Sequence, residues 1–171
     1  MNTSSPTSHY GRYMYFAMWI LVLILLSAAF YRWDQATTNP NQSPTARALS
    51  ADRYEIVLQR NRHGHYVANG TINGVNVTFF LDTGATDISI PGHIADKLKL
   101  KAGYKRTYQT ANGDIENYTT TLKSISIGAI KRNNIRASIN PNAQYDEILL
   151  GMSFLKTVEL IQRGDTLTIR G

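Results

Sequence analysis

Residues 79–86 read Phe-Phe-Leu-Asp-Thr-Gly-Ala-Thr, and this stretch decides the fold. Its three leading apolar residues predict the end of a buried strand, and Asp82 follows them directly. The pair Thr83-Gly84 then predicts a tight turn, because Gly84 lets one backbone segment approach another closely. A carboxylate in this place is fixed at the end of a strand instead of moving freely at the surface. Asp82 is therefore a candidate catalytic residue.

Apolar and polar residues alternate with a period of two on both sides of this stretch, as is typical of β-strands. Asn73-Gly74 is the strongest turn signal, because both residues tolerate the positive φ of a type I′ turn. The only helical spacing is a short one after Pro91. Strands are expected at 54–58, at 65–72 as its return strand, and at 75–81, 125–127, 135–139 and 166–170, with turns at 61–64, at Gly128 and Asn133-Asn134, and at 163–165. Many short strands predict an all-β domain, a small barrel or sandwich.

Length and composition exclude several classes of protein. A chain of 171 residues has room for one ordinary domain and an appendage, but not for a two-lobed enzyme. It has no cysteine, which excludes disulfides, a thiolate metal site and a Cys nucleophile, and we expect no metal and no cofactor. Because the net charge is +6, a nucleic-acid or anionic-lipid partner has to be considered. The densest basic stretch, 97–106, is interpreted as a solvated helix face and loop, so no nucleic-acid partner is expected.

The N-terminal part of the chain is strongly apolar. Residues 14–31 carry no formal charge, Arg12 and Arg32 flank them, and Tyr and Trp residues gather at both ends. This pattern predicts a tail over 1–12 and a single transmembrane helix over 13–33. A cleaved signal peptide is the alternative, because Ser27-Ala28-Ala29 offers small residues before Phe30. Both interpretations export the C-terminal remainder of the chain, and the large size of that remainder favours the short N-terminus inside.

Residues 34–53 are polar and contain two prolines, with almost no large apolar side chain. This composition predicts a flexible linker, because the segment cannot bury enough surface to offset the entropy of ordering it. The remaining residues, 54–171, form the expected β-domain.

The residues around Asp82 resemble the Asp-Thr-Gly-Ala active-site loop of the retroviral-type aspartic proteases. The resemblance extends to Ile148-Leu149-Leu150-Gly151, which has the form of the hydrophobic pair and Gly that precede a short helix in that family. Between them, Thr107 to Tyr118 is placed correctly for a flap hairpin with its tip at 110–113. The match covers about residues 54–169 and is most similar to the bacterial membrane-anchored members of the clan. It implies a closed β-barrel with one or two short helices, on a single-pass protein of the bacterial inner membrane with the catalytic domain in the periplasm.

The chain has only one Asp-Thr-Gly motif, because the other Asp-Thr pair, Asp165-Thr166, is followed by Leu167. One chain therefore supplies half of an active site. Hydrolysis without a metal or a covalent nucleophile needs one carboxylate to take a proton from water and another to donate one. Two Asp82 side chains that meet across a twofold axis satisfy this requirement by sharing one proton. We therefore expect a homodimer, and confinement of two copies to a membrane plane raises their effective concentration.

The resemblance implies roles for the residues near Asp82. Thr83 would brace the two loops across the dimer, Gly84 would present backbone to the substrate, and Ala85 matches the retroviral form. The expected substrate-binding residues, in the flap and the subsites, are Asp87, Ala111, Asn112, Gly113, Leu150 and Gly151. Asp87 is equally open to interpretation as an exposed loop residue.

One departure from the family concerns the segment after Gly151. Retroviral enzymes continue with Arg and then Asn or Asp, whereas this chain has Met152-Ser153, so the ion pair made by that Arg is missing. The C-terminal strand, 166–170, would interleave with that of a second copy as in the viral enzymes.

The sequence thus predicts a membrane-anchored aspartic endopeptidase that hydrolyses extended peptide segments with two Asp82 carboxylates. The alternative is an exported β-barrel module that binds peptides or proteins without cutting them.

Overall fold

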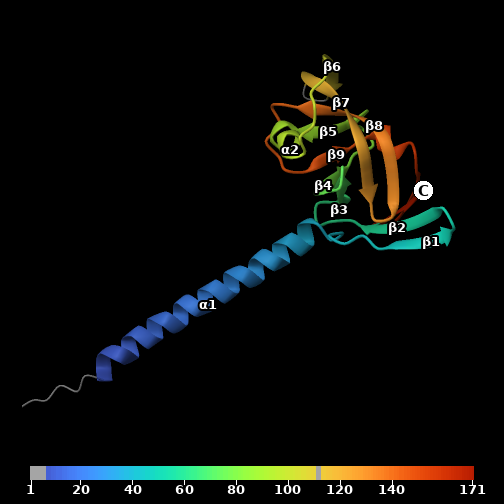
Figure 1. The fold of residues 1–171 in the computed structure, drawn as a ribbon. Helices are drawn as coiled ribbons and strands as arrows, with labels where there is room; N and C mark the ends of the chain where they lie inside the picture. Colours follow the sequence, from blue (N-terminus) through green and yellow to red (C-terminus); the bar gives the residue numbers. More distant parts are fainter. Residues whose placement is uncertain (1–6, 111–112) are drawn as a thin grey trace, which may run out of the picture. The chain divides into compact units, whose positions relative to one another are not determined.

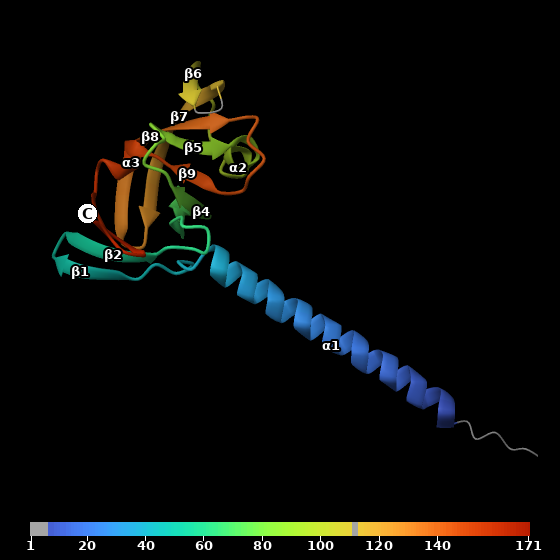
Figure 2. The same cartoon turned by 180° about the vertical axis from the view of Figure 1, so that it is seen from behind.

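The structure is a computed structural model of the chain, and it describes residues 7–110 and 113–171 (Figures 1 and 2). The chain divides after Thr37 into two compact units. The first contains the helix α1, Thr7–Thr38, which ends one residue into the second unit. The second is built almost entirely of strands.

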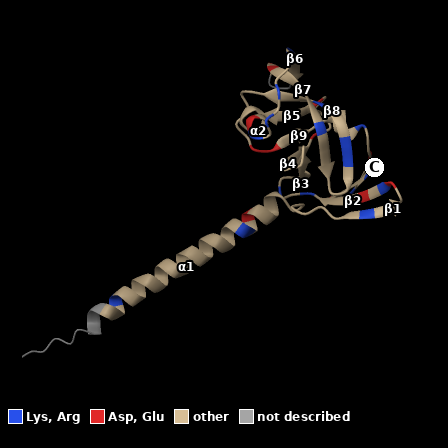
Figure 3. Ribbon diagram, in the orientation of Figure 1, with Lys and Arg blue, Asp and Glu red and all other residues tan. Residues whose placement is uncertain are grey.

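Helix α1 is long and apolar enough to cross a membrane over Tyr10–Thr38, a stretch of 29 residues. At 1.5 Å per residue this stretch spans about 43 Å, more than the roughly 30 Å of a bilayer's hydrocarbon core. Apolar side chains in its middle are exposed, as Leu23 and Leu26 are. Figure 3 shows charged residues only close to the two ends of the helix. The helix therefore contains the whole of the predicted span, 13–33.

The second unit contains two β-sheets. The smaller sheet has four strands in the order β1-β2-β11-β10, and the larger has seven in the order β3-β4-β9-β5-β8-β7-β6. An additional pairing between β3 and β7 joins the two sides of the larger sheet and closes it into a barrel. The strands are β1 Ala46–Ser50, β2 Arg53–Gln59, β3 Val67–Ile72, β4 Val75–Leu81, β5 Ile88–Pro91, β6 Lys105–Thr110, β7 Gly113–Ile127, β8 Ile130–Asn140, β9 Ile148–Leu150, β10 Glu159–Arg163 and β11 Thr166–Arg170. The predicted all-β barrel is confirmed.

Two short helices complete this unit. Helix α2, Gly92–Lys97, follows Pro91 at the position of the predicted helical spacing. Helix α3, Met152–Leu155, follows Gly151 and is labelled in Figure 2. Both pack apolar side chains into the core. Its largest fully buried members are Phe154 of α3 and, from strands of both sheets, Phe79, Ile56, Leu58, Ile72, Ile88, Ile90, Leu122, Ile125, Ile127, Ile130 and Ile148.

Local turn signals placed most of the hairpins correctly. Asn73 and Gly74 have φ of 51° and 83° and join β3 to β4, as the type I′ turn requires. Gly164, with φ of 56°, lies between β10 and β11. The turn between β7 and β8 lies at Gly128, whereas Asn133 lies inside β8 opposite Ser124.

The expected hairpin between 54–58 and 65–72 is not formed. Strand β2 pairs with β1 and β11, and β3 pairs with β4 and β7 in the other sheet. The connection redirects the chain because the side-chain Oδ1 of Asn61 accepts hydrogen bonds from the backbone N–H groups of His63 and His65, each at 2.9 Å. The chain thus passes from one sheet to the other at this turn.

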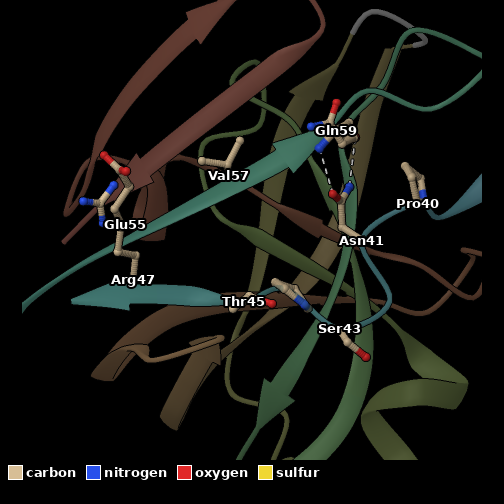
Figure 4. Close-up of a pocket in the computed structure, with 9 residues that line it drawn as sticks. Pro40, Asn41, Ser43, Thr45, Arg47, Glu55, Val57 and Gln59 are labelled. Carbon is tan, nitrogen blue, oxygen red and sulfur yellow. Dashed lines mark hydrogen bonds between the residues drawn. The ribbon is translucent and has the colours of Figure 1, made fainter. Parts of the chain in front are cut away.

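The stretch expected to be a linker, 34–53, has regular structure at both ends: α1 continues to Thr38, and β1 pairs with β2. Between them Asn41 is buried, and its side-chain Nδ2 donates to the carbonyl oxygens of Gln59 and Val67 at 2.9 and 2.7 Å. Its Oδ1 accepts from the backbone N–H of Gln59 at 2.7 Å (Figure 4). The polar side chains that make the segment look like a tether here satisfy backbone groups of both sheets. With β2 the segment lines a hollow of about 430 Å³.

Candidate active site

Asp82 lies directly after strand β4, at the point where β4 meets β9. The two strands run parallel, with Leu81 opposite Leu150, and the backbone N–H of Asp82 donates to the carbonyl oxygen of Leu150 at 3.2 Å. The loop that follows turns tightly: the N–H of Ala85 donates to the carbonyl oxygen of Asp82 at 3.3 Å. The end of β4, in which Phe79 alone is fully buried, thus fixes the backbone of Asp82.

The carboxylate of Asp82 is oriented by its own loop. The backbone N–H of Gly84 donates to its Oδ1 at 2.8 Å, and a Cβ at Gly84 would lie only 3.2 Å from that oxygen. Asp82 and Ala85 are half-buried, whereas Thr83 and Gly84 are exposed. The loop therefore presents a carboxylate in a defined orientation, with exposed backbone beside it.

The segment around Gly151 holds the other side of this loop. The N–H groups of Met152 and Ser153 donate to the carbonyl oxygens of Ala85 and Thr86 at 2.8 and 3.0 Å. Gly151 is required because a Cβ there would lie 2.6 Å from the carbonyl oxygen of Ala85 and closer still to that of Asp87. Leu150 and Gly151, expected to contact substrate, are buried and support the loop from inside.

Ser153 stands where the retroviral enzymes have Asn or Asp. Its side-chain Oγ accepts a hydrogen bond from the backbone N–H of Ile88 at 3.1 Å, which fixes the start of β5. A hydroxyl group thus ties the short helix to the loop that carries Asp82. The sequence departure at this position leaves the loop supported by a different hydrogen bond.

Asp87 is buried, and both of its carboxylate oxygens are bound within the chain. Its Oδ2 accepts from the hydroxyl of Tyr108 at 2.9 Å, and its Oδ1 accepts from Nε of Arg136 at 2.8 Å. Burial raises the pKa of the Tyr108 phenol, and the hydrogen bond to Asp87 raises it further. The hydrogen bond to Asp87, followed by its charge, raises the pKa of Arg136. The expected substrate-contact residue thus has its side chain turned into the protein.

The predicted flap falls in the hairpin of β6 and β7, in which Thr107 pairs with Glu116 and Tyr108 with Ile115. Gly113 begins β7 with φ of 102°, a conformation that favours glycine. The other two expected tip residues, Ala111 and Asn112, lie outside the described residues. A hairpin therefore lies at the predicted position, with paired strands on both sides of the predicted tip.

A hollow of about 510 Å³ adjoins the candidate catalytic loop, residues 82–87. Asp82 supplies its only carboxylate among the described residues, and Thr83 lies beside it. Most of the remaining lining is apolar or aromatic: His65, Tyr66, Phe80, Leu81, Leu155, Leu160, Gln162 and Leu167. A single half-buried carboxylate in such a site can orient a water molecule but cannot also donate a second proton to the same substrate.

Sequence reasoning missed Tyr108 and Arg136 as neighbours of Asp87. The three residues are far apart in the chain, and only the parallel pairing of β5 with β8, with Ile88 opposite Ala137, brings Asp87 next to Arg136. No local signal marks such a contact. The sequence alone shows only that Arg136, a basic residue, directly precedes Ala137.

A family model described as "gag-polyprotein putative aspartyl protease" matches residues 68–157. An uncharacterized protein of a Sinorhizobium species is 35% identical over 90% of this chain and 71% of its own length. An uncharacterized protein of Rickettsia prowazekii is 38% identical over 60% of this chain and 45% of its own length.

A solved structure shares the fold. The retropepsin-like aspartic protease from Rickettsia conorii superposes with a TM-score of 0.62 and 35% identity, over 72% of this chain and 96% of that one. The matched region contains the Asp82 loop, the hairpin of β6 and β7, and the segment around Gly151. The chain belongs to the retropepsin-like aspartic protease family.

Proposed function

We propose that the chain is an aspartic endopeptidase that hydrolyses extended polypeptides as a homodimer, with one Asp82 contributed by each copy. The observation that carries this proposal is the oriented carboxylate of Asp82, whose Oδ1 accepts from the N–H of Gly84 in a hollow with no other carboxylate among the described residues. The nearest other acid in the loop, Asp87, is already bound to Tyr108 and Arg136. A second proton-transferring carboxylate must therefore come from another copy.

In the proposed reaction the two Asp82 carboxylates share one proton, because two like charges a few Å apart do not both ionise. The ionised carboxylate takes a proton from the attacking water, and the protonated one donates to the scissile carbonyl oxygen. Thr83, exposed beside Asp82, would brace the loops of the two copies. Gly84 would offer backbone to the substrate, and the β6–β7 hairpin would cover it.

The proposed dimer differs from the viral one in its C-terminal strand. Strand β11 lies between β2 and β10 of the same chain, so both of its edges are already paired. In this arrangement β11 therefore cannot pair with a strand of a second copy. The proposed contact surface is instead the hollow next to Thr83, where Leu155, Leu160 and Leu167 lie.

Localisation follows from α1. The helix is suited to anchor the chain in a membrane, and we propose the bacterial inner membrane with the β-domain on the periplasmic side. Anchoring would confine two copies to a plane and favour their pairing.

The test uses the full chain in detergent and a library of fluorogenic peptides. Asp82→Asn should abolish cleavage while the far-ultraviolet circular dichroism stays that of the wild type. Adding an equal amount of Asp82→Asn to a fixed amount of fully dimeric wild type should lower activity to about half, because random pairing converts half of the active copies into mixed dimers. Asp96→Asn, an exposed change on α2, should have no such effect when it is added.

Cleavage that persists in Asp82→Asn would contradict the assignment of Asp82. Activity that stays constant when the inactive variant is added would contradict the dimer. Binding of library peptides without any cleavage would support the alternative, a β-barrel module that binds peptides.

A further inference from the structure

A cluster of charged and polar groups connects the catalytic loop to the β6–β7 hairpin. At its centre the Asp87 side chain is 1% exposed, and it bonds Tyr108 of β6 and Arg136 of β8 at 2.9 and 2.8 Å. A buried carboxylate is stabilised only when such partners satisfy it. Asp87 therefore fixes the position of both side chains.

Arg136 is held in place at one nitrogen only. Its Nε donates to Asp87, whereas its side chain remains 53% exposed. Within 7–110 and 113–171, its two terminal nitrogens have no carboxylate partner. A guanidinium group is planar and binds carboxylates through two parallel hydrogen bonds. Arg136 is thus a pre-oriented cation with donors available to a ligand.

A second guanidinium group lies close by. Arg106 of β6 is exposed, and its Cζ lies 5.5 Å from the centre of the Tyr108 ring. In the part of the chain that the structure describes, Arg106 forms no ion pair, while the neighbouring acid Glu116 is paired with Lys105 at 2.8 Å. Tyr108 therefore contacts the guanidinium group of Arg106 through its ring and the carboxylate that binds Arg136 through its hydroxyl.

The cluster lies where an extended substrate would pass. Asp87 follows Asp82 by five residues on the catalytic loop, and Tyr108 and Arg106 belong to the hairpin that would cover the substrate. The bond between Tyr108 and Asp87 thus links the loop after Asp82 to that hairpin. This placement rests on the proposed function.

We propose that Arg136 and Arg106 form a subsite that selects an acidic side chain of the polypeptide substrate, with Asp87 as the residue that positions Arg136. The negative charge of Asp87 is buried behind Arg136, so the face turned to solvent is cationic. A substrate carboxylate would gain two charge-assisted hydrogen bonds there, and the matching amide would gain weaker ones.

The experiment compares pairs of peptides that differ only by Glu or Gln at one position, built on a sequence that the full chain cleaves. At one position the wild type should prefer Glu by roughly five- to tenfold in kcat/KM, as expected for a partly exposed charge-assisted contact. The preference should shrink as ionic strength rises from about 0.05 to 0.5 M, because salt screens exposed charges. The Glu-to-Gln ratio is the readout in every variant.

Arg136→Gln should bring the ratio close to one, and Arg106→Gln should lower it partially. Arg106→Gln leaves the buried Asp87 with both of its partners, so it tests the subsite even if Arg136→Gln is unstable. Asp87→Asn should lower the ratio by loosening Arg136. Arg163→Gln, which removes the same charge from the turn between β10 and β11, should keep the wild-type ratio.

A wild-type ratio of one at every position, with cleavage intact, would overturn the subsite and leave the proposed function standing. Absence of all cleavage would overturn the proposed function. In that case the affinity of the Glu and Gln peptides for Asp82→Asn, measured by fluorescence anisotropy, would decide the subsite separately. Equal affinities would then overturn it, and a preference for Glu would support it.

Discussion

The backbone N–H of Met152 donates to the carbonyl oxygen of Ala85 across 2.8 Å, so the segment after β9 and the catalytic loop are bonded backbone to backbone. The backbone N–H groups of Asp82 and Ser153 likewise donate to the carbonyl oxygens of Leu150 and Thr86. The position of the Asp82 carboxylate therefore depends on the main-chain geometry around Gly151. This dependence makes the site sensitive to the volume of one side chain.

Gly151→Ala should destabilise the second unit by about 3 kcal/mol, because overpacking against backbone cannot be relieved by a side-chain movement. The new Cβ would lie 2.6 Å from the carbonyl oxygen of Ala85. Urea unfolding of the full chain in detergent measures the loss. Gly164→Ala is the control, because a Cβ added there would meet no atom within 4 Å. Only the positive φ of 56° should destabilise this variant, by about 1 kcal/mol. Equal effects of the two substitutions would contradict a steric role for Gly151.

Asn41→Ala should lower the stability of the same unit by about 2 to 3 kcal/mol. The substitution leaves the backbone N–H of Gln59 and the carbonyl oxygens of Gln59 and Val67 without their side-chain partner. Gln42→Ala removes a neighbouring side chain that is exposed, and it should change stability by about 0.5 kcal/mol or less. Thermal unfolding monitored by circular dichroism compares the two variants. Equal midpoints would show that residues 39–45 are a tether after all.

Local signals in the sequence predicted the parts of the fold that neighbouring residues determine. Asn73-Gly74 specifies its own turn through the φ values that both residues tolerate. Phe79-Phe80-Leu81 specifies a strand that ends directly before Asp82, although Phe79 alone of the three is fully buried. The short helix after Gly151, by contrast, was implied by the family resemblance and not by a local helical pattern. These elements include the catalytic loop, which explains why the candidate site could be placed from sequence.

Contacts between distant segments could not be predicted in this way. Asp87 was predicted to contact substrate, with an exposed loop residue as the alternative, and neither interpretation included Tyr108 and Arg136, the partners that bind it from 21 and 49 residues away. Asn41 looked like part of a tether, because composition does not reveal that an amide side chain will satisfy backbone groups of two sheets. In both cases sheet pairing across long separations determines the contact.

Ile169→Ala should destabilise the second unit by about 2 to 4 kcal/mol. This loss of stability should be the same at every protein concentration. Ile169 of β11 is 1% exposed and lies opposite Leu160 and Ile56 of its own chain. Unfolding by urea, repeated over a hundredfold range of concentration, tests this. Val57→Ala on β2, at a side chain that is 47% exposed, should cost about 0.5 kcal/mol or less. A loss that grows on dilution would instead indicate that Ile169 packs against a second copy.

Tyr108→Phe should cost about 1.5 kcal/mol of stability near neutral pH, because it removes the hydrogen bond from the hydroxyl to the Asp87 carboxylate. This cost should shrink in alkali. Burial, and then the bond to Asp87, raises the pKa of Tyr108, so above the ordinary pKa of about 10 the folded chain holds a proton that the unfolded chain has lost. That part of the stability is complete below about pH 10 and is lost as pH rises through the folded-state pKa.

Urea unfolding of the wild type and Tyr108→Phe at about pH 8 and about pH 11 measures this change. The free-energy difference between the two proteins should be smaller at the higher pH. Tyr104→Phe is the matched control, because the Tyr104 side chain is 71% exposed and its substitution near neutral pH should cost about 0.5 kcal/mol or less. A difference between wild type and Tyr108→Phe that stays constant from neutral to alkaline pH would contradict the bond between the hairpin and the catalytic loop.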